Sequence, residues 1–334
     1  MKRIAVVILN WNGVELLEQF LPSIYKHTNL DEVDVIVADN GSTDNSVAFV
    51  NQHFPWVITN SLEQNFGFAE GYNKALANLD YEYVVLLNSD VEVDENWLSS
   101  AIEYLDNNKE YAALQPKILS YYYNPYFEYA GACGGFIDKY GYPFCRGRIL
   151  NTVEHDYGQY FEPMDIFWAS GACLFIRLKD FREVGGFDAN FFAHQEEIDL
   201  CWRLNTKGKK IVCYPSSVVY HVGGATLHKD NPNKTYLNFR NNLLMLHKNL
   251  PAEVYTKTMN MRWFLDYLSA MHFVLKGQFS NALSVWKARR DFNKLKHQYN
   301  TVREQSKDMP NTVYTKSIIW QYYINKNKKY SQLK

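Results

Sequence analysis

Residues 83–94 read YVVLLNSDVEVD, in which a largely apolar run leads directly into Asn88, Ser89 and Asp90. An apolar run of this length, rich in Val and Leu, is typical of a strand that is buried on both faces of a parallel sheet. In open α/β sheets ligands bind outside the carboxyl ends of the strands, so Asp90 stands where a metal ligand is expected. Asn, Ser and Asp also favour turns, and taken alone these three residues fit a turn equally well.

Strand and helix patterns alternate through the first part of the chain. Residues 4–9 form one apolar run, and a second run over residues 33–38 ends at Asp39. Apolar residues at helical spacing follow each run, and Pro22 is expected to kink or shorten the first helix. A third short strand is expected near residues 56–59. This alternation predicts a Rossmann-like, mostly parallel α/β sheet flanked by helices, with right-handed crossovers.

Polar residues follow the predicted strands at the points where they end. The segment from Asn10, together with Asp39 and Asp90, should therefore meet at one edge of a parallel sheet. A loop with Asn65 and Gly67 is expected nearby, since glycine lets a backbone approach a ligand closely. Each pattern alone also fits an ordinary cap or loop. Neither GxGxxG after the first strand nor GxxxxGK[ST] occurs, so we expect any bound phosphates to be held through a metal.

Two later segments add candidate residues. Residues 166–177, IFWASGACLFIR, predict a strand with Ser170 and Gly171 at its centre, where a ligand or another backbone can come close. Tight sheet packing explains the same small residues. The Tyr-, Gly- and Pro-rich residues 114–159 do not predict a defined secondary structure, and their aromatic rings fit either sugar stacking or surface loops packed by their own rings.

An acidic cluster lies in QEEIDLCWR, residues 195–203, which predicts a helix beginning near Glu196. The helix dipole favours acids in a first turn, which is a purely structural explanation. The functional alternative is a general base that takes a proton from an attacking hydroxyl, with Glu197 as the candidate and Glu196 in reserve. His221 ends an apolar strand beside glycines and is a candidate metal ligand, although a lone histidine is more often a hydrogen-bonded structural residue.

The composition narrows the class of protein. The formal net charge of -1 over 334 residues indicates no global attraction to nucleic acid. The five cysteines are odd in number and lack CxxC spacing, so we expect reduced thiols in a cytoplasmic protein. The apolar start is too short for a secretory signal, and no uncharged apolar stretch reaches the roughly 18 residues of a membrane span.

The last third of the chain has a different pattern, so we expect a catalytic domain over residues 1–230 and a helical region over residues 231–334. One helix is expected from Asn238, and an apolar one over residues 263–279 should lie in an interface without spanning a membrane. Beyond it the chain is basic and aromatic. Two arrangements stay open for this region: contact with anionic lipid headgroups, which would place the protein on the inner face of the plasma membrane, or packing on the catalytic domain or a homodimer partner. Nucleic acid is not expected, because no binding module accompanies the charge. The basic residues are Lys287, Arg289, Arg290, Lys294, Lys296, Arg303, Lys316, Lys326, Lys328, Lys329 and Lys334.

Taken together, the motifs VVILNWNG, VADNGSTD, NFGFAEGYN, LLNSDVEVD, ASGACLFIR, GGFD, QEEIDLCWR and HVGG, in this order, resemble the family 2 glycosyltransferases. The resemblance covers residues 3 to about 225. Within the family, the chain resembles the rhamnosyl- and hexosyltransferase type. It implies the GT-A fold and an inverting transfer of a sugar from a nucleotide-diphosphate donor to an acceptor hydroxyl. It also implies assistance by Mg²⁺ or Mn²⁺.

The resemblance implies roles for residues at matching positions. Leu9 and Trp11 would line the nucleotide site, Asp39 would bind the base or ribose, and Asn65 and Gly67 would form the neighbouring loop.

The DxD position of the family is occupied by Asn88, Ser89 and Asp90. Ser89 and Asp90 would contact the donor, and Asp90 would hold the metal together with His221. Glu197 matches the second acid of the family's Glu-Asp pair, which acts as the catalytic base. Two departures matter: Asn88 stands where a carboxylate is usual, and Glu197 is one methylene longer than Asp. Candidate contacts to the acceptor or sugar are Trp168, Ser170, Gly171 and His194.

We therefore expect a metal-dependent inverting glycosyltransferase that transfers to a saccharide or lipid-linked acceptor in surface polysaccharide synthesis. The chemistry needs a cation on the leaving diphosphate and a base on the opposite face. Two other classes stay open. A glycoside hydrolase would use Asp90 and Glu197 as its carboxylate pair and need no nucleotide. A nucleotide-sugar-binding or scaffold protein would carry a weakened site, as the two departures would allow.

Overall fold

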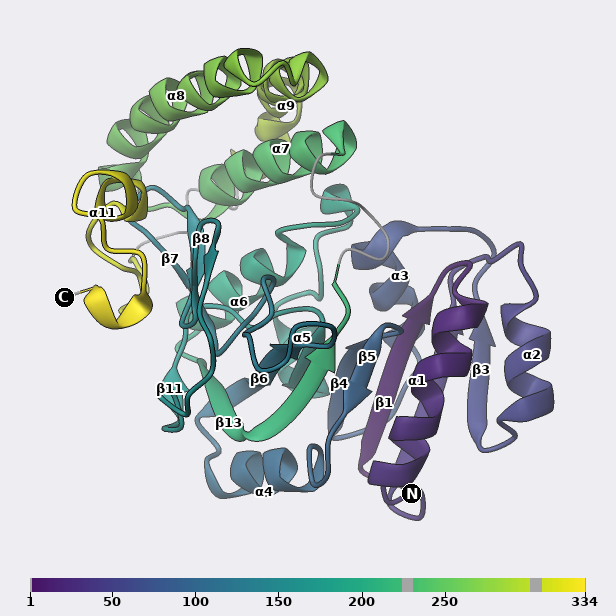
Figure 1. The fold of residues 1–334 in the computed structure, drawn as a ribbon. Coiled ribbons are helices and arrows are strands. Elements are labelled where there is room, and N and C mark those ends of the chain that lie inside the picture. The colour runs from purple at the N-terminus through teal and green to yellow at the C-terminus, as the bar shows by residue number, and fades with distance from the viewer. Residues whose placement is uncertain (1, 224–230, 301–307, 334) are drawn as a thin grey trace.

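The computed structural model describes residues 2–223, 231–300 and 308–333. Its centre is a mixed nine-stranded sheet in which eight strands run in the order β11, β13, β6, β12, β4, β1, β2, β3 and β5 pairs with β13 (Figure 1). Their bounds are β1 Ile4–Asn10, β2 Val33–Asp39, β3 Val57–Ser61, β4 Tyr83–Asn88, β5 Val91–Val93, β6 Tyr111–Ser120, β11 Met164–Asp165, β12 Cys173–Arg177 and β13 Lys210–His221.

The strands expected in the first part of the chain are confirmed. β4 pairs in parallel with β1, β1 with β2, and β2 with β3. β13 and β6 are also parallel, whereas β12 is antiparallel to β4 and β6. The sheet is therefore mostly parallel, as predicted. Its parallel strands end at one edge, where β12 begins, so this edge gathers both strand ends and the loop before β12.

Helices cover both faces of the sheet. Successive residues of β1 point to opposite sides, so Val6 packs in one apolar cluster and Val7 in the other. Helices α1, α2 and α4 contribute to the first cluster, and α3, α5 and α6 to the second. Their bounds are α1 Val14–His27, α2 Ser46–His53, α3 Gly67–Leu76, α4 Ser99–Asn107, α5 Leu178–Glu183 and α6 Glu196–Thr206.

Some expected elements have different bounds in the structure. Helix α1 is not shortened at Pro22 but continues to His27. The strand expected over residues 166–177 was predicted too long, because β12 begins only at Cys173. The Ser170 N–H donates to the Gln115 side chain at 2.8 Å, so Ser170 and Gly171 form a turn before the strand instead of its centre. The apolar strand that His221 ends is β13, whose register against β6 shifts between Tyr214 and Val218.

The region left open over residues 114–159 contains most of β6 and the whole of a second, antiparallel sheet in the order β10, β9, β8, β7. These strands are β7 Gly135–Ile137, β8 Pro143–Cys145, β9 Arg148–Ile149 and β10 Thr152–Val153. All five cysteines are buried free thiols. Cys133 and Cys213 bring their sulfur atoms to 3.7 Å across the two sheets without a disulfide.

The C-terminal region is helical, as expected. Helix α7 lies over α6, and α8 and α9 lie beyond it on the side away from the central sheet (Figure 1). Within the described residues no helix is both long and apolar enough to cross a membrane. Arg303, Lys334 and Gly224 of the motif HVGG lie outside the described residues. The bounds are α7 Pro232–Asn249, α8 Ala252–Leu275, α9 Phe279–Leu295 and α11 Ile318–Tyr323, with 3₁₀ turns η1 Ala189–Phe191, η2 Lys296–Tyr299 and η3 Tyr330–Gln332.

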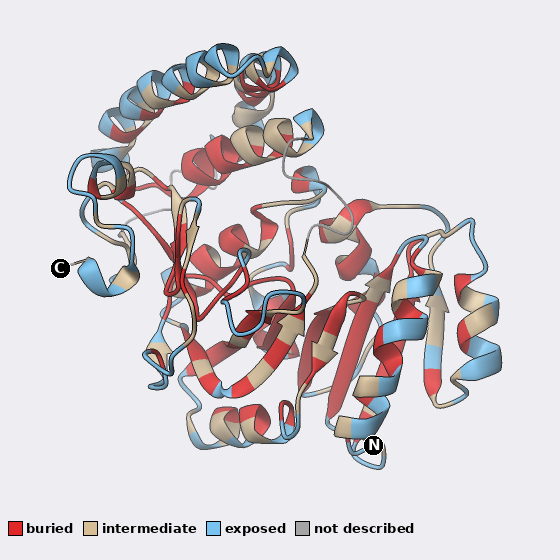
Figure 2. Cartoon of the chain, viewed as in Figure 1, coloured by how far each residue is buried: buried red, intermediate tan, exposed pale blue. Residues whose placement is uncertain are grey.

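The expected apolar helix over residues 263–279 is two helices, because α8 ends at Leu275 and α9 starts at Phe279. The residue between them with a positive φ is Gly277, at +74°. Burial follows the layers in Figure 2, where the sheet and α6 are buried and the outer side of α8 is exposed.

Candidate functional site

The strand ends of β1 and β2 hold Asp39 in place. Asn10 donates from its side-chain amide to one Asp39 oxygen at 3.1 Å, and the Ser42 N–H donates to the other at 3.0 Å. The two residues are paired across the strands and both are buried. The side-chain oxygen of Asn10 is buried without a hydrogen-bond partner. A polar group that is left unpaired in this way is costly unless a bound partner satisfies it, which marks this edge as a ligand site.

The loop with Asn65 and Gly67 joins this edge, as expected. Asn40, which follows β2, donates to the Asn65 side chain at 3.2 Å and to the Gly67 carbonyl at 3.0 Å. Gly67 has a φ of +76°, and a Cβ there would lie 2.5 Å from the Phe192 ring. Only glycine fits this position, because the conformation is left-handed and the ring is too close.

Leu9, Trp11 and Ser89 surround the same edge in different ways. Leu9 packs on α3, where a Cβ on Gly71 would lie 2.9 Å from its side chain. Trp11 has half of its surface exposed, so its ring is accessible to a planar ligand. Ser89 lies beside Gly13, since a Cβ added there would be 3.8 Å from its hydroxyl. These three residues lie at the same edge as Asp39.

Asp90 and His221, the two candidate metal ligands, lie next to each other. The His221 Nε2 atom lies 3.1 Å from an Asp90 oxygen and 3.4 Å from the Asn88 amide. Burial alone would raise the pKa of Asp90, but His221 holds it below its usual range. Burial alone would lower the pKa of His221, and the two acids Asp90 and Glu128 raise it to about 10. These shifts describe the pair without a metal, and a cation bound here would replace the proton of the His221 imidazole, because only the neutral ring is a ligand.

The donor set at this point fits a hard divalent cation. A carboxylate, an imidazole and the side chain of Asn88 converge, and the oxygen and nitrogen of that amide can be exchanged by a flip. Within the described residues no group of three His, Cys, Asp or Glu could bind a metal ion. A cation here would take Asp90, His221 and the Asn88 oxygen, with water and a ligand phosphate completing its coordination.

Glu128 is a residue that the sequence did not point to. Its carboxylate lies 3.6 Å from Nδ1 of His221, on the side away from Asp90. An acid on the second nitrogen of a metal-binding histidine orients the ring, which is a common supporting contact. Glu128 stands in the aromatic region whose structure no local pattern predicted, so only the fold brings it here.

The acidic cluster begins α6, as expected. Glu196 and Glu197 each have one carboxylate oxygen buried without a hydrogen-bond partner. Burial, and then the neighbouring Glu197, raises the pKa of Glu196 well above its usual range. Burial raises the pKa of Glu197 to about 7. Glu196 is buried, whereas Glu197 is partly exposed, so at neutral pH Glu197 is the one that can take up a proton from a ligand.

The segment before α6 is unusual in its backbone. Phe192, His194 and Gln195 have φ values of 62°, 71° and 75°, a region that residues other than glycine seldom adopt. Such conformations persist only where surrounding contacts impose them. Here a single side chain on α7, Asn241, donates to the carbonyls of Phe191, Ala193 and His194 at 2.7 to 2.9 Å.

The same segment joins the acidic helix to the strand ends. The Phe192 carbonyl accepts hydrogen bonds from the N–H groups of Phe68 at 2.7 Å and Ala69 at 3.1 Å, in the first turn of α3. Since α3 follows the Asn65–Gly67 loop, Glu197 is coupled through one short segment to the edge that carries Asp39 and Asp90.

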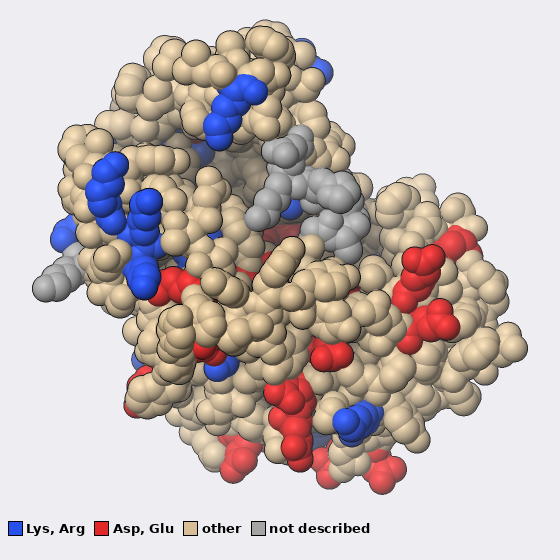
Figure 3. Space-filling view, viewed as in Figure 1, with Lys and Arg blue, Asp and Glu red and all other residues tan. Residues whose placement is uncertain are grey.

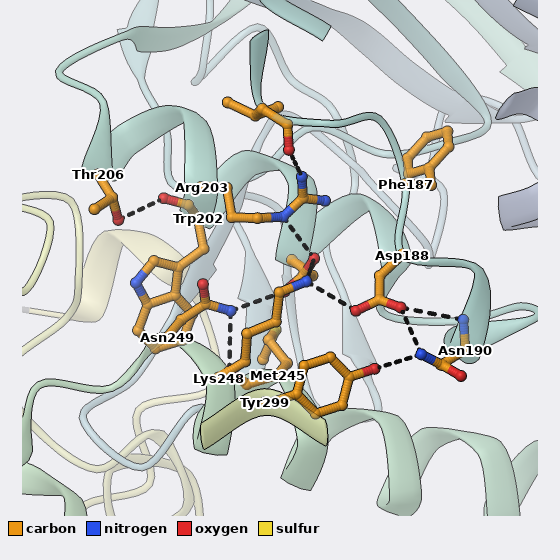
Figure 4. A network of polar contacts seen from close by, with 12 residues as sticks. Phe187, Asp188, Asn190, Trp202, Arg203, Thr206, Met245, Lys248, Asn249 and Tyr299 are labelled. Carbon is orange, nitrogen blue, oxygen red and sulfur yellow. Dashed lines mark hydrogen bonds and ion pairs between the residues drawn. The ribbon is translucent and has the colours of Figure 1, made fainter. Parts of the chain in front are cut away.

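A buried polar network fixes α6 from the other side (Figure 4). Lys248 of α7 donates to Asp188 and to Asp199, each at 2.9 Å, and Asn249 donates to Asp199 at 2.8 Å. Arg203 adds a 2.8 Å ion pair to Asp199. Burial alone would raise the pKa of Asp199, but Lys248 and Arg203 hold it below its usual range.

The four candidates for acceptor or sugar contacts lie in different environments. Trp168 is buried and donates to the Phe136 carbonyl at 3.0 Å, so its ring is part of the core. Ser170 is buried beside Gly131, and Gly171 packs against the Phe68 ring. Burial, with Lys234 nearby, lowers the pKa of His194 to about 4, so its imidazole is neutral. The Nε2 atom of His194 is buried without a hydrogen-bond partner. Their part in binding remains a prediction.

The α7 residues that hold the site were also missed by sequence reasoning. Asn241 and Asn242 stand side by side within a helix, where amides have low propensity. Asn242 donates to the Gln195 side chain at 2.9 Å, directly before Glu196. The two adjacent amides in a helical pattern were a visible signal, but the sequence did not indicate which groups they bind.

Comparison with known proteins agrees with this geometry. The family described as Glycosyl transferase family 2 matches residues 5–185. The N-acetylglucosaminyl-diphospho-decaprenol L-rhamnosyltransferase of Mycobacterium tuberculosis (strain CDC 1551 / Oshkosh) is 29% identical over 233 residues, covering 65% of this chain and 75% of the relative. Rhamnosyltransferase WbbL of Escherichia coli (strain K12) is 24% identical over 225 residues, covering 64% of this chain and 81% of the relative.

Solved structures share the fold. GalNAc-T7, crystallised with UDP, GalNAc and Mn²⁺, aligns with a TM-score of 0.59 at 15% identity, covering 98% of this chain, which spans 57% of that chain's length. The mannosyltransferase PcManGT from Pyrobaculum calidifontis, in complex with GDP-Man and Mn²⁺, aligns with a TM-score of 0.53 at 14% identity, covering 90% of this chain and 84% of its own. At these identities the likeness concerns the GT-A fold alone.

Proposed function

The chain belongs to glycosyl transferase family 2 and is a glycosyltransferase of the hexosyltransferase type; we propose that it transfers a sugar, with inversion, from a nucleotide-diphosphate donor to an acceptor hydroxyl. The observation that supports this most is the link between the two halves of the site. One segment, around Phe192, contacts α3 of the strand-end edge and leads into Glu197. A donor at the edge and a base at α6 would then share one rigid frame.

The donor half would bind the nucleotide. Trp11 would stack on the base, and Asp39, which is held by Asn10 and Ser42, would accept hydrogen bonds from the base or ribose. Asn65 and Gly67 would form the neighbouring wall. Leu9 and Ser89 complete the proposed set of donor contacts.

Mg²⁺ or Mn²⁺ would be held by Asp90, His221 and the Asn88 oxygen. When bound, the cation neutralises the charge that develops on the leaving diphosphate. Asp90 provides the one protein carboxylate, and Glu128 orients the His221 ring from its other nitrogen. The amide at Asn88 leaves more of the coordination to water and phosphate than two carboxylates would.

Glu197 would act as the base. Its carboxylate takes the proton from the acceptor hydroxyl as the oxygen attacks the anomeric carbon from the face opposite the leaving group. The raised pKa of about 7 makes this carboxylate a stronger base than an ordinary glutamate while leaving it partly ionised at neutral pH. His194, Ser170 and Gly171 are the proposed acceptor or sugar contacts, whereas the Trp168 ring is packed in the core next to Ser170 and Gly171 in the sequence.

The names of two relatives support a class of acceptor. The M. tuberculosis relative acts, by its name, on a diphospho-decaprenol, and a Haloferax volcanii relative, 23% identical over 247 residues, is a low-salt glycan biosynthesis hexosyltransferase. We therefore propose a saccharide or lipid-linked acceptor in surface polysaccharide synthesis. We propose two alternative roles for the C-terminal region. It would either hold the protein in the cytoplasm on the inner face of the plasma membrane, or form the contact of a homodimer.

The test is donor turnover. The purified chain would be screened with nucleotide sugars for release of the nucleoside diphosphate, with Mn²⁺ and with EDTA. We expect turnover only with the metal, and a loss of at least about a hundredfold in Asp90→Ala and Glu197→Gln. Metal-independent turnover, or full activity in both variants, would refute the proposal. No turnover with any donor, despite nucleotide-sugar binding, would favour a scaffold protein instead.

A further inference from the structure

Helix α8 is oriented with its polar residues inward. Its buried side chains are Thr258, Arg262 and Asp266, which recur at intervals of four and share one face. Phe264, Met271 and Leu275 are exposed and, at about 100° per residue, lie on the opposite face. A helix on the surface of a water-soluble protein normally has the reverse arrangement.

The inward polar residues fix the helix in this orientation. Arg262 and Asp266 form an ion pair at 3.1 Å, and Arg289 of α9 also pairs with Asp266. Arg262 donates to the Tyr140 carbonyl at 3.2 Å, and the Tyr142 hydroxyl donates to Asp266 at 3.3 Å. Turning the helix to bury its apolar side would leave these charges without their partners, which is strongly unfavourable.

The outer face is large and apolar. Leu275 and Phe279 leave 78% and 67% of their surface exposed. A cavity of about 290 Å³ between α8 and α9 is lined by Trp263, Tyr267, Trp286, Arg289, Arg290 and Asn293. Contiguous exposed apolar surface of this kind marks an interaction site. We name this surface the α8–α9 face; its exposed apolar residues are Met261, Trp263, Phe264, Tyr267, Leu268, Met271, Val274, Leu275, Phe279, Leu283 and Trp286.

The charge around this face is mostly positive, although Asp291 of α9 forms an ion pair with Arg290 at 3.0 Å. Between residues 254 and 290 the only acid is Asp266, and it is fully buried. The exposed cations in the same range are Lys257, Lys276, Lys287 and Arg290. In Figure 3 the visible surface over the C-terminal helices carries Lys and Arg, whereas Asp and Glu gather over the sheet-bearing half of the molecule.

We propose that the α8–α9 face docks on an anionic lipid bilayer. Apolar side chains such as Phe264 and Leu275 enter the boundary of the acyl chains, Trp263 and Trp286 lie at headgroup depth, and the surrounding cations contact lipid phosphates. A second copy of this chain is a poorer occupant, because a symmetric contact through the face would bring like charges together. The proposal concerns where the protein binds and does not depend on which sugar it transfers.

The test uses the full chain and lipid vesicles, with co-sedimentation as the measurement. We expect binding to phosphatidylcholine vesicles that contain phosphatidylglycerol, weaker binding to pure phosphatidylcholine, and weakening by salt. The triple variant F264S/M271S/L275S should lower the partition coefficient at least about tenfold. The variant K276E/K287E/R290E should lower binding to the anionic vesicles by roughly a hundredfold.

The matched control is I58S/F161S/I324S, which replaces three exposed apolar residues far from α8 in the sequence and should bind vesicles like the wild type. Thermal unfolding of each variant confirms its fold. Donor turnover should be unchanged in F264S/M271S/L275S, which separates a failure of docking from a failure of the proposed activity. Absence of wild-type binding, or equal binding of F264S/M271S/L275S, would overturn the proposal. If the wild type did not bind vesicles but self-associated, and F264S/M271S/L275S abolished this self-association while the control variant did not, the face would be assigned to a second copy.

Discussion

Two neighbouring carboxylates begin α6, and their surroundings separate their chemistry. Burial, and then the neighbouring Glu197, raises the pKa of the buried Glu196 well above its usual range, whereas burial raises the pKa of the partly exposed Glu197 to about 7. A general base must be ionised at the start of the reaction, and it is most effective when its pKa lies near the operating pH. The sequence left the choice between the two open, and their different burial favours Glu197.

This difference predicts opposite responses to the same substitution. Glu197→Gln should lower kcat for sugar transfer by about 10²- to 10⁴-fold, because the proton acceptor is lost. Glu196→Gln should change kcat by less than about tenfold at neutral pH, since Glu196 is buried and the amide has nearly the same shape. In the wild type, kcat/KM should fall as the pH drops through about 7, because protonated Glu197 cannot act as a base.

A pH–rate profile of kcat/KM checks this assignment. A profile with no acidic limb near pH 7 would contradict the role of Glu197. If Glu196→Gln were the inactive variant and Glu197→Gln were not, the base would be Glu196. Binding of the donor to both variants, measured by calorimetry, serves as the control for a folded site.

At the scale of elements, α7 holds the segment that carries the base. Asn241 donates to three backbone carbonyls in the segment before α6, and Lys248 pairs with both Asp188 and Asp199. The left-handed residues Phe192, His194 and Gln195 keep their conformation because these bonds impose it. The geometry of Glu197 therefore depends on a helix that contributes no catalytic group.

Lys248→Met should lower the free energy of unfolding by roughly 3–5 kcal/mol, because Asp199 would remain buried with less compensation. Urea denaturation measures this change. Lys109→Met is the matched control: Lys109 forms an ion pair with Asp106 at 3.1 Å but is mostly exposed, so the cost should stay below about 1 kcal/mol. Equal costs for the two variants would show that the network of α7 does not stabilise the fold.

At the scale of the whole molecule, the sheet and the C-terminal helices share one core. Leu243, Leu244, Met245 and Leu246 of α7 are fully buried in the same apolar cluster as Trp202 of α6. The contacts continue outward, since Arg262 of α8 bonds to Asn242, which bonds to Gln195 beside the acidic pair. The buried side of α8 is therefore joined by hydrogen bonds to Gln195, two residues before the proposed base.

A chain ended after residue 230 should consequently not fold into an active domain. It would expose the apolar surface that α7 covers and leave Asp199 without Lys248. We expect aggregation or loss of near-UV circular dichroism, and no donor turnover, whereas the full chain unfolds cooperatively. A soluble, cooperatively folded and active fragment would contradict this expectation and would make residues 1–230 an independent domain.

The sequence alone predicted the parallel strands β1 to β4 and the edge at which their polar ends meet. Apolar runs in β1, β2 and β4 are local signals, and parallel strands necessarily bring Asp39 and Asp90 to one edge. Tertiary packing determined the long-range contacts and the burial of individual side chains, which local patterns do not specify. Glu128 reaches His221 from a region without periodicity, Trp168 is buried in the core, and α8 presents its apolar side to solvent. The physical reason is that burial and charge pairing depend on distant residues, whereas strand and helix periodicity depends on near neighbours.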